Sequence, residues 1–169
     1  MIVFKFFLLP VFVFGLSFPT LAGTITGQAR IIDGDTLQIA GKRIRLHGID
    51  TPELRQFCTF NPRKWPCGVR AKEALVALIG GQQIRCEKQD MDRYGRIVAV
   101  CFANEINLNA SLVAGGWGLA YRRYSKDYVD EENEARKNHR GMWRGSFISP
   151  WEWRHQRRFF KRKVAPKTR

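Results

Sequence analysis

Turn-forming residues divide much of the chain into short strands, and this spacing restricts the fold more than any other feature of the sequence. The segments are rich in β-branched and other apolar residues, which favour strands. Asp33-Gly34-Asp35 joins the first two, because Asp and Gly are typical turn residues. The five predicted strands are Thr24–Ile32, Thr36–Ala40, a segment marked by Ile44, Leu46 and Ile49, Gln83–Gln89, and Arg96–Phe102.

Helical spacing is found between and after these strands. Apolar residues from Val69 to Ile79 predict a helix that Gly80-Gly81 ends, and Asn107–Ala114 predicts a short second one. A last helix is expected to begin near Asp127 and to stop at Gly141. Residues 51–68 have no clear period and are expected to form a loop. Five short strands with a helix after the third predict a mainly β, α+β fold, namely an OB-type barrel with three helices.

Residues 1–22 have the features of a secretory signal peptide. Lys5 supplies a positive charge, Phe6 to Phe18 form a short apolar run, and small residues precede a cleavage point after Ala22. The alternative is an uncleaved anchor, but two prolines interrupt a run that falls short of the ~20 residues needed for a span. We expect a secreted or periplasmic protein without stable membrane insertion after cleavage.

The formal net charge of +14 favours a polyanionic partner, either nucleic acid or an acidic membrane surface. Residues 154–169 contain eight basic residues and no acidic one. This segment is expected to be either a solvated, partly disordered tail or an electrostatic arm for nucleic acid, with Phe159 and Phe160 available for stacking. The predicted organisation is a signal peptide over 1–22, one globular domain over 23–153 and a basic tail over 154–169.

Four cysteines after the leader fit two disulfides in an oxidising compartment, for which three pairings are possible. Cys86 and Cys101 lie at equal distances from the middle of the predicted hairpin, so regular pairing would place them opposite each other. Cys58 and Cys67 would then close a short loop. Zinc binding is the alternative, although neither pair has CxxC spacing and no His lies near either.

Three charged clusters follow one another at the predicted turns, and they carry the chemistry of the chain. They are Asp33–Thr36, then Arg45 with Asp50–Glu53, then Asp92–Arg96. Carboxylates at strand ends can hold a divalent cation, guanidinium groups can bind a phosphate in a fork, and a further carboxylate can activate water. Each cluster alone could be an ordinary turn. Together they indicate a metal-assisted phosphodiesterase.

The same residues in the same order resemble the staphylococcal nuclease (thermonuclease) family over about residues 26–143. The resemblance implies the strand order of a five-stranded OB barrel with three helices. It also implies a calcium-dependent endonuclease that hydrolyses DNA and RNA with little sequence specificity and leaves 3′-phosphate ends. We expect single-stranded substrates to be preferred, and the protein to be a monomer without an obligate protein partner.

Residue roles follow from the resemblance by position. It implies that Arg45 and Arg96 stabilise the attacked phosphate and that Glu53 activates water. It also implies that Asp35, Asp50 and the carbonyl of Thr51 bind calcium, and that Asp33 lies just outside these ligands and shapes the metal site through water. Tyr94 and Tyr121 are the implied nucleotide-binding residues. The chain departs from the family where Arg123 takes the place of a second tyrosine, with Tyr124 one residue further on.

Two other functions compete with the nuclease. The same barrel could hold nucleic acid without cleaving it, but the full set of candidate catalytic residues argues for activity. A cationic membrane-active protein would depend on residues 154–169. Deletion of that segment should abolish function in the membrane-active case and only weaken binding in the nuclease case.

Overall fold

The computed structural model describes residues 23–164, with side chains through Phe160, so the predicted signal peptide lies outside the described residues. The strands are β1 (Thr24–Gly27), β2 (Ala29–Ile31), β3 (Thr36–Ile39), β4 (Lys42–Leu46), β5 (Ile49–Asp50), β6 (Cys58–Phe60), β7 (Arg63–Trp65), β8 (Ile84–Met91), β9 (Ile97–Ala103), β10 (Ile106–Asn107) and β11 (Leu119–Ala120). The helices are α1 (Cys67–Ile79), α2 (Leu108–Ala114), α3 (Val129–Lys137), the 3-10 helix η1 (Gly141–Arg144) and α4 (Pro150–Val164).

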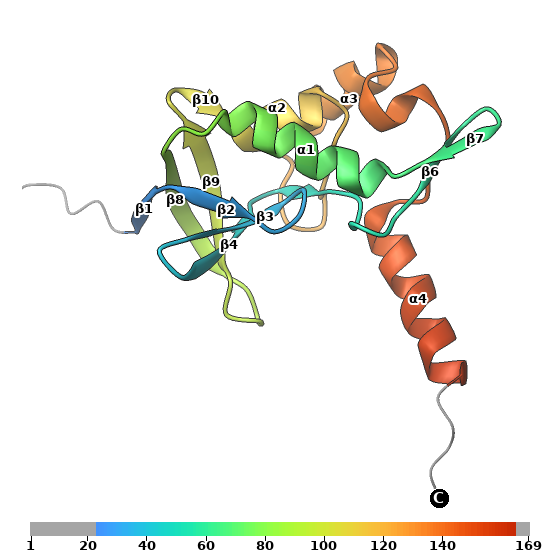
Figure 1. Ribbon diagram of the computed structural model, residues 1–169, viewed down its shortest axis with the longest axis horizontal. Helices are drawn as coiled ribbons and strands as arrows, with labels where there is room; N and C mark the ends of the chain where they lie inside the picture. Colours follow the sequence, from blue (N-terminus) through green and yellow to red (C-terminus); the bar gives the residue numbers. More distant parts are fainter. Residues whose placement is uncertain (1–22, 165–169) are drawn as a thin grey trace, which may run out of the picture.

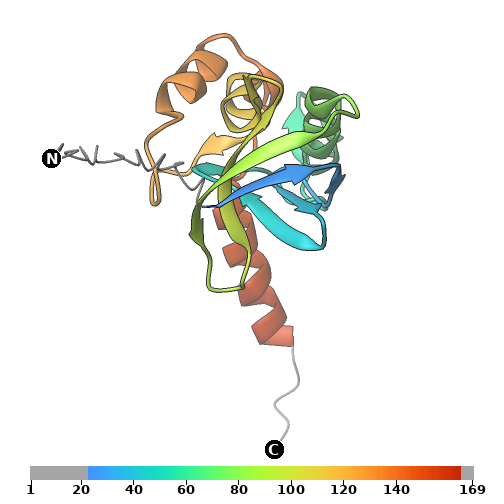
Figure 2. The same cartoon turned by 90° about the vertical axis from the view of Figure 1, so that its left-hand side faces the viewer.

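The main sheet curls into a partial barrel with strand order β1-β8-β9-β4-β3-β2, and β10 pairs with β9 (Figures 1 and 2). Neighbouring strands are antiparallel except β4 and β9, which run parallel. The short pair β5–β11 brings Asp50 opposite Leu119. This arrangement confirms the predicted α+β class and its OB-type barrel.

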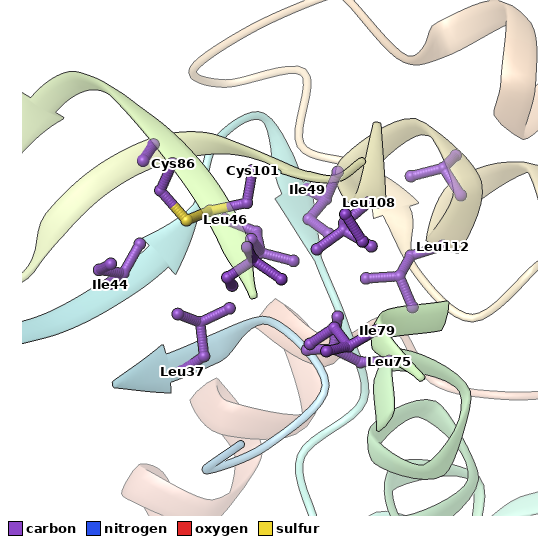
Figure 3. Packing of buried hydrophobic residues seen from close by; sticks show 14 of the residues in the cluster. Leu37, Ile44, Leu46, Ile49, Leu75, Ile79, Cys86, Cys101, Leu108 and Leu112 are labelled. Atoms are coloured by element: carbon purple, nitrogen blue, oxygen red, sulfur yellow. A yellow bond between two sulfur atoms is a disulfide. The ribbon is translucent and has the colours of Figure 1, made fainter. Parts of the chain in front are cut away.

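The core fills the space between the sheet and helices α1 and α2 (Figure 3). Alternate residues of the strands face inward, as a sheet with one buried face requires, and Leu37, Ile44 and Leu46 are almost completely buried. Leu75 on α1 and Leu112 on α2 close the core from the helical side, and both side chains are fully buried. The core therefore holds β3 and β4, whose ends carry the candidate site residues, against a rigid base.

The cysteines pair as expected, Cys58 with Cys67 and Cys86 with Cys101. Cys86 and Cys101 lie directly opposite each other on β8 and β9. A bulge shifts the register only nearer the turn, between Lys88 and Asp90, so it leaves the cysteine pair undisturbed.

Several expected elements differ from the structure. The first predicted strand is divided into β1 and β2, and the third into β4 and β5. The segment expected to be a loop contains the β6–β7 hairpin. The last predicted helix, α3, ends at Lys137, so Gly141 is not its stop but the first residue of η1.

The largest difference lies at the C-terminal end of the described chain. Residues 150–164 form α4, which adds a fourth α-helix to the three expected among the described residues. This helix begins against the body of the protein and then projects away from it in both views (Figures 1 and 2). The expected boundary at residue 153 therefore falls inside a helix. Within residues 23–164, no helix is both long and apolar enough to cross a membrane.

Candidate active site

A cavity of about 550 Å³ opens where the ends of β3 and β4, the loop after β5, the β8–β9 hairpin and α4 meet. Almost every sequence-predicted site residue lines it, and Asp50 lies directly behind its wall. The lining residues among those predicted are Asp33, Asp35, Arg45, Thr51, Glu53, Tyr94, Arg96 and Tyr121. Clusters that are up to 88 residues apart in the sequence, from Asp33 to Tyr121, thus meet at one place.

Asp35 is fixed at the start of β3 by the turn that precedes it. The backbone N–H of Asp35 donates to Asp33 Oδ1 at 3.1 Å, which closes the turn. Its own Oδ2 accepts from the backbone N–H of Thr51 at 3.2 Å. Gly34 permits this approach, because a Cβ there would lie 2.6 Å from Thr51 Oγ1. Asp-Gly-Asp therefore does more than turn the chain, since it seats a buried carboxylate against the loop after β5.

Arg45 joins the two predicted metal ligands. Its Nη1 lies 3.1 Å from Asp35 Oδ1 and its Nη2 lies 2.8 Å from Asp50 Oδ1. Burial alone would lower the pKa of Arg45, but the charges of Asp35 and Asp50 outweigh burial and raise this pKa above its usual range. Arg45 is therefore always cationic, and it holds two carboxylates close together that would otherwise repel each other.

The carboxylates of the site are crowded in an environment that disfavours their charge. Burial raises the pKa of Asp33 to about 6, and the neighbouring charge of Asp35 adds to the increase. Burial also raises the pKa of Asp50; a hydrogen bond from Arg154 opposes this increase, while the charge of Asp35 adds to it. Repulsion among buried carboxylates is the condition that a bound cation relieves.

Glu53 lies two residues after Thr51, just beyond Pro52, and its side chain is 35% exposed to the cavity. The backbone of this loop is tied down, because the N–H of Gln56 donates to the Glu53 carbonyl at 2.7 Å. Gln56 is buried and its side-chain amide donates to the carbonyl of Ile148 at 2.6 Å. Hydrogen bonds therefore fix the backbone that carries the candidate base.

Arg96 and Tyr94 come from the turn of the β8–β9 hairpin. The Arg96 guanidinium lies 2.7 Å from Asp92 Oδ2, and its Nη1 reaches Thr36 Oγ1 at 3.5 Å. The ring of Tyr94 is 67% exposed and lies 5.8 Å from the Arg96 guanidinium carbon. The hairpin thus presents a cation and an aromatic face to the cavity.

The second predicted nucleotide-binding tyrosine is less free. Tyr121 lines the cavity, but its ring stacks on Trp151 of α4 with centroids 5.8 Å apart, and it meets Tyr124 edge-on at 4.8 Å. Tyr124 is 67% exposed and lines the cavity, whereas Arg123 does not. Tyr124 therefore offers the open aromatic surface on this side.

Arg154 is a candidate site residue that the sequence does not predict, because it lies in the segment expected to be a basic tail. It lies in the second turn of α4 and its guanidinium contacts both Asp50 oxygens, at 3.0 and 2.7 Å, and Glu53 Oε1 at 2.9 Å. No local pattern distinguishes Arg154, since the sequence contains eight basic residues in this segment. Only the fold brings Arg154 into contact with Asp50.

The donor set fits a hard divalent cation. Asp35 and Asp50 are 4% and 0% exposed and both contact the Arg45 guanidinium, and the backbone of Thr51 lies against Asp35. Oxygen donors without His or Cys suit calcium or magnesium. Among residues 23–160, no group of three or more His, Cys, Asp and Glu side chains is placed to hold a metal ion. The two aspartates would therefore need backbone, water or substrate oxygens to complete the coordination shell.

Comparison with known proteins agrees with this geometry. The family described as "Staphylococcal nuclease homologue" matches residues 43–145. An "Uncharacterized endonuclease" of Escherichia coli is 32% identical over 158 residues, in an alignment that covers 88% of this chain and 97% of that protein. A "Micrococcal nuclease" of Shigella flexneri is 32% identical over 157 residues, covering 82% and 85% of the two chains. The "Protein ParB" of Escherichia coli is 33% identical over 145 residues, with coverage of 75% and 77%.

The family match includes Arg45, the Asp50–Glu53 loop and the hairpin that carries Arg96, so it covers most of the residues that meet at the cavity. The relatives align over most of their own length and most of this chain. By sequence, fold and the residues of the cavity, this chain belongs to the staphylococcal nuclease family.

Proposed function

We propose that the protein is a calcium-dependent nuclease that hydrolyses phosphodiester bonds of DNA and RNA with little sequence specificity. The observation that supports it best is the meeting of Asp35 and Asp50 at the Arg45 guanidinium, with Glu53 and Arg96 on the same cavity. Family membership and the names of the nuclease relatives support the same class of reaction.

In this mechanism each side chain has one task. Asp35, Asp50 and the Thr51 carbonyl would hold calcium, which when bound supplies positive charge next to the scissile phosphate. Glu53 accepts a proton from the attacking water, because its carboxylate borders the cavity two residues after Thr51. Arg45 and Arg96 donate to the phosphate oxygens on which charge gathers in the transition state. The 5′-oxygen leaves, so the products end in a 3′-phosphate.

Substrate binding in this proposal relies on stacking and charge, with no reading of base identity. The open rings of Tyr94 and Tyr124 are both 67% exposed at the cavity, where bases of a single strand could stack on them. The net charge of +14 attracts the phosphate backbone. A duplex would have to open before its bases reached these rings, which favours single-stranded substrates.

Export is part of the same proposal. The predicted signal peptide and the two disulfides favour a secreted or periplasmic protein. Mass spectrometry of the protein recovered from its natural host would give the first residue and the number of free thiols. Cleavage after Ala22 and no free thiol is the expected result, and a retained leader or free thiols would contradict it.

The experiment that tests the activity is cleavage of single-stranded DNA by the mature chain with calcium, with a chelator, and with Glu53→Gln. Glu105→Gln serves as the matched control, because Glu105 lies in the exposed turn between β9 and β10, outside the cavity. We expect calcium-dependent cutting that is lost in Glu53→Gln and kept in Glu105→Gln. Tight binding of DNA without cutting under any metal would instead favour the competing function, a non-catalytic nucleic-acid-binding module.

A further inference from the structure

Arg154 lies between a buried carboxylate and the cavity. Asp50 is completely buried and does not line the cavity, whereas Arg154 does. The Arg154 side chain is 24% exposed and forks onto both Asp50 oxygens, at 3.0 and 2.7 Å. At the edge of the cavity, the Arg154 guanidinium therefore occupies both oxygens of the Asp50 carboxylate.

A divalent cation and this guanidinium cannot use the same face of Asp50 together. Calcium needs oxygen ligands at about 2.3–2.6 Å, and its charge would repel an arginine held on the same carboxylate. Arg45 already occupies the other side of Asp50, with its Nη2 2.8 Å from Oδ1. Both arginines line the cavity, but Arg45 contacts only Oδ1 of Asp50 and is also held by Asp35. Arg154 holds Oδ2 as well as Oδ1, so Arg154 is the arginine that has to move when a cation binds.

The backbone that carries Arg154 is fixed, so the guanidinium would move without leaving the site. Trp151, one helical turn earlier, stacks on Tyr121 with nearly parallel rings, and this contact holds the first turn of α4 against the body. Arg158, one turn later, borders the same cavity. A guanidinium released from Asp50 stays beside the cavity, where it can bind a phosphate in a fork.

We infer that Arg154 is an additional residue of the phosphodiesterase site. It covers Asp50 and Glu53 in the absence of a cation, gives up Asp50 when a divalent cation binds, and then donates to a phosphate of the polynucleotide substrate. The inference rests on the proposed function for the identity of the substrate. It assigns α4, and so part of the segment expected to be a tail, to the active site.

Two opposite effects of one substitution test whether Arg154 exchanges Asp50 for a phosphate when a cation binds. Calcium binding to the mature chain without nucleic acid is measured by titration calorimetry for the wild type, Arg154→Gln, Arg154→Lys and Arg157→Gln. Arg157→Gln is the matched control, because it removes the same charge about one turn later on α4, where Arg157 lies over the Trp153 ring and outside the cavity. Arg154→Gln should bind calcium about tenfold tighter or more, since one charge-assisted contact no longer competes. Arg157→Gln should change the affinity less than about twofold, and Arg154→Lys should lie between.

The same variants are then assayed for cleavage of single-stranded DNA at saturating calcium. Arg154→Gln should lower kcat/KM by roughly tenfold to a hundredfold despite its tighter calcium binding, because a phosphate ligand is lost. A merely structural role would weaken both calcium binding and cleavage. Unchanged or weaker calcium binding by folded Arg154→Gln would overturn the exchange, and unchanged cleavage would overturn the phosphate contact.

The outcomes separate this inference from the proposed function. If the wild type cuts DNA but Arg154→Gln does not bind calcium more tightly, the nuclease stands and the exchange fails. If the wild type cuts nothing, the nuclease fails, while the calorimetry still decides whether Arg154 competes with the cation. Circular dichroism checks that each variant is folded. If Arg154→Gln does not fold, Arg154→Lys decides the test: a calcium affinity equal to or below that of the wild type would overturn the exchange.

Discussion

Asp92 binds both the side chain and the backbone of Arg96 across the turn of the β8–β9 hairpin. Asp92 Oδ2 accepts from the Arg96 guanidinium at 2.7 Å, and Oδ1 accepts from the Arg96 backbone N–H at 3.0 Å. Oδ1 also accepts the N–H of Tyr94 at 2.9 Å. One carboxylate thus sets the shape of the turn and the direction of a candidate phosphate ligand.

Asp92→Asn should therefore impair cleavage although Asp92 is not assigned any contact with substrate. The amide keeps one acceptor for the turn but loses the charge that holds the guanidinium, so Arg96 becomes mobile. We expect kcat on single-stranded DNA to fall by about tenfold, because a misplaced donor loses part of its transition-state stabilisation. Glu87→Gln, which removes the same charge from β8 outside the cavity, should leave kcat unchanged. Equal activity of Asp92→Asn and wild type would show that Asp92 does not position Arg96.

The same pair predicts how stability depends on pH. Burial alone would raise the pKa of Asp92, but hydrogen bonds from Arg96 and Tyr94 hold it below its ordinary value. A carboxyl with a lowered pKa in the folded state stabilises the protein above the unfolded-state pKa, and this contribution is lost as the pH falls through the folded-state pKa. Wild type should therefore melt at a higher temperature than Asp92→Asn at pH 5–7. The gap should narrow as the pH is lowered from about 4 towards 2, and a gap that widens there would contradict the assignment.

Arg45→Lys tests whether charge alone is enough at the meeting point of the two aspartates. A lysine keeps the positive charge but cannot donate to Asp35 and Asp50 in a fork and still reach a phosphate. The expected loss in kcat/KM is on the order of 10²–10³. Arg43→Lys is the matched control, because Arg43 is exposed on the same strand and opposite Gln38. Similar losses in both variants would point to a general charge effect instead of the specific contacts of Arg45.

The parts of the site that could be predicted from sequence are those fixed by local geometry. Asp33-Gly34-Asp35 is a turn because of its residue types, and it places Asp35 at the start of β3. The Cys86–Cys101 pair follows from the symmetry of a single hairpin, since the residues before its bulge keep regular register. Such features depend on neighbours in sequence, which is why the pattern of residues alone identifies them.

What could not be predicted depends on packing between distant segments. Arg154 meets Asp50 across 104 residues, and no pattern in α4 distinguishes it from the arginines around it. From residue 154 on, the sequence predicts a tail in place of α4, because a segment dominated by Lys and Arg is usually solvated. The β6–β7 hairpin was missed because prolines and the disulfide obscure any alternation in residues 51–68.

Loss of the Cys86–Cys101 disulfide should weaken the barrel without touching the catalytic groups. Both sulfur-bearing side chains are fully buried in the core, and the bond closes a chain segment with a sequence separation of 15. For the double variant Cys86→Ala/Cys101→Ala we expect a loss of about 3 kcal/mol in the free energy of unfolding. Guanidinium denaturation measures this, and activity at low temperature should persist while the fold is intact. A loss below about 1 kcal/mol would show that the barrel does not depend on this link.

Gly68 connects the packing of α1 to the candidate base. It is buried in the first turn of the helix, and a Cβ there would lie 1.8 Å from the Glu53 carbonyl oxygen. Gly68→Ala must therefore push the Glu53 backbone away from its place. Because a displacement of about 1 Å at a catalytic group can reduce the rate by a factor of about 10², cleavage should fall by tenfold to a hundredfold.

The control for Gly68→Ala separates displacement from general destabilisation. Overpacking at Gly68 is expected to cost about 1–3 kcal/mol of stability, and Ile79→Val at the other end of α1 costs about 0.5–1.5 kcal/mol without approaching Glu53. Both variants are assayed at a temperature where denaturation curves show them fully folded. Gly68→Ala should then be impaired and Ile79→Val should cleave normally. Full activity in folded Gly68→Ala would mean that the position of the Glu53 backbone does not control the reaction. In that case the Glu53 side chain would have to compensate for the shift of its backbone.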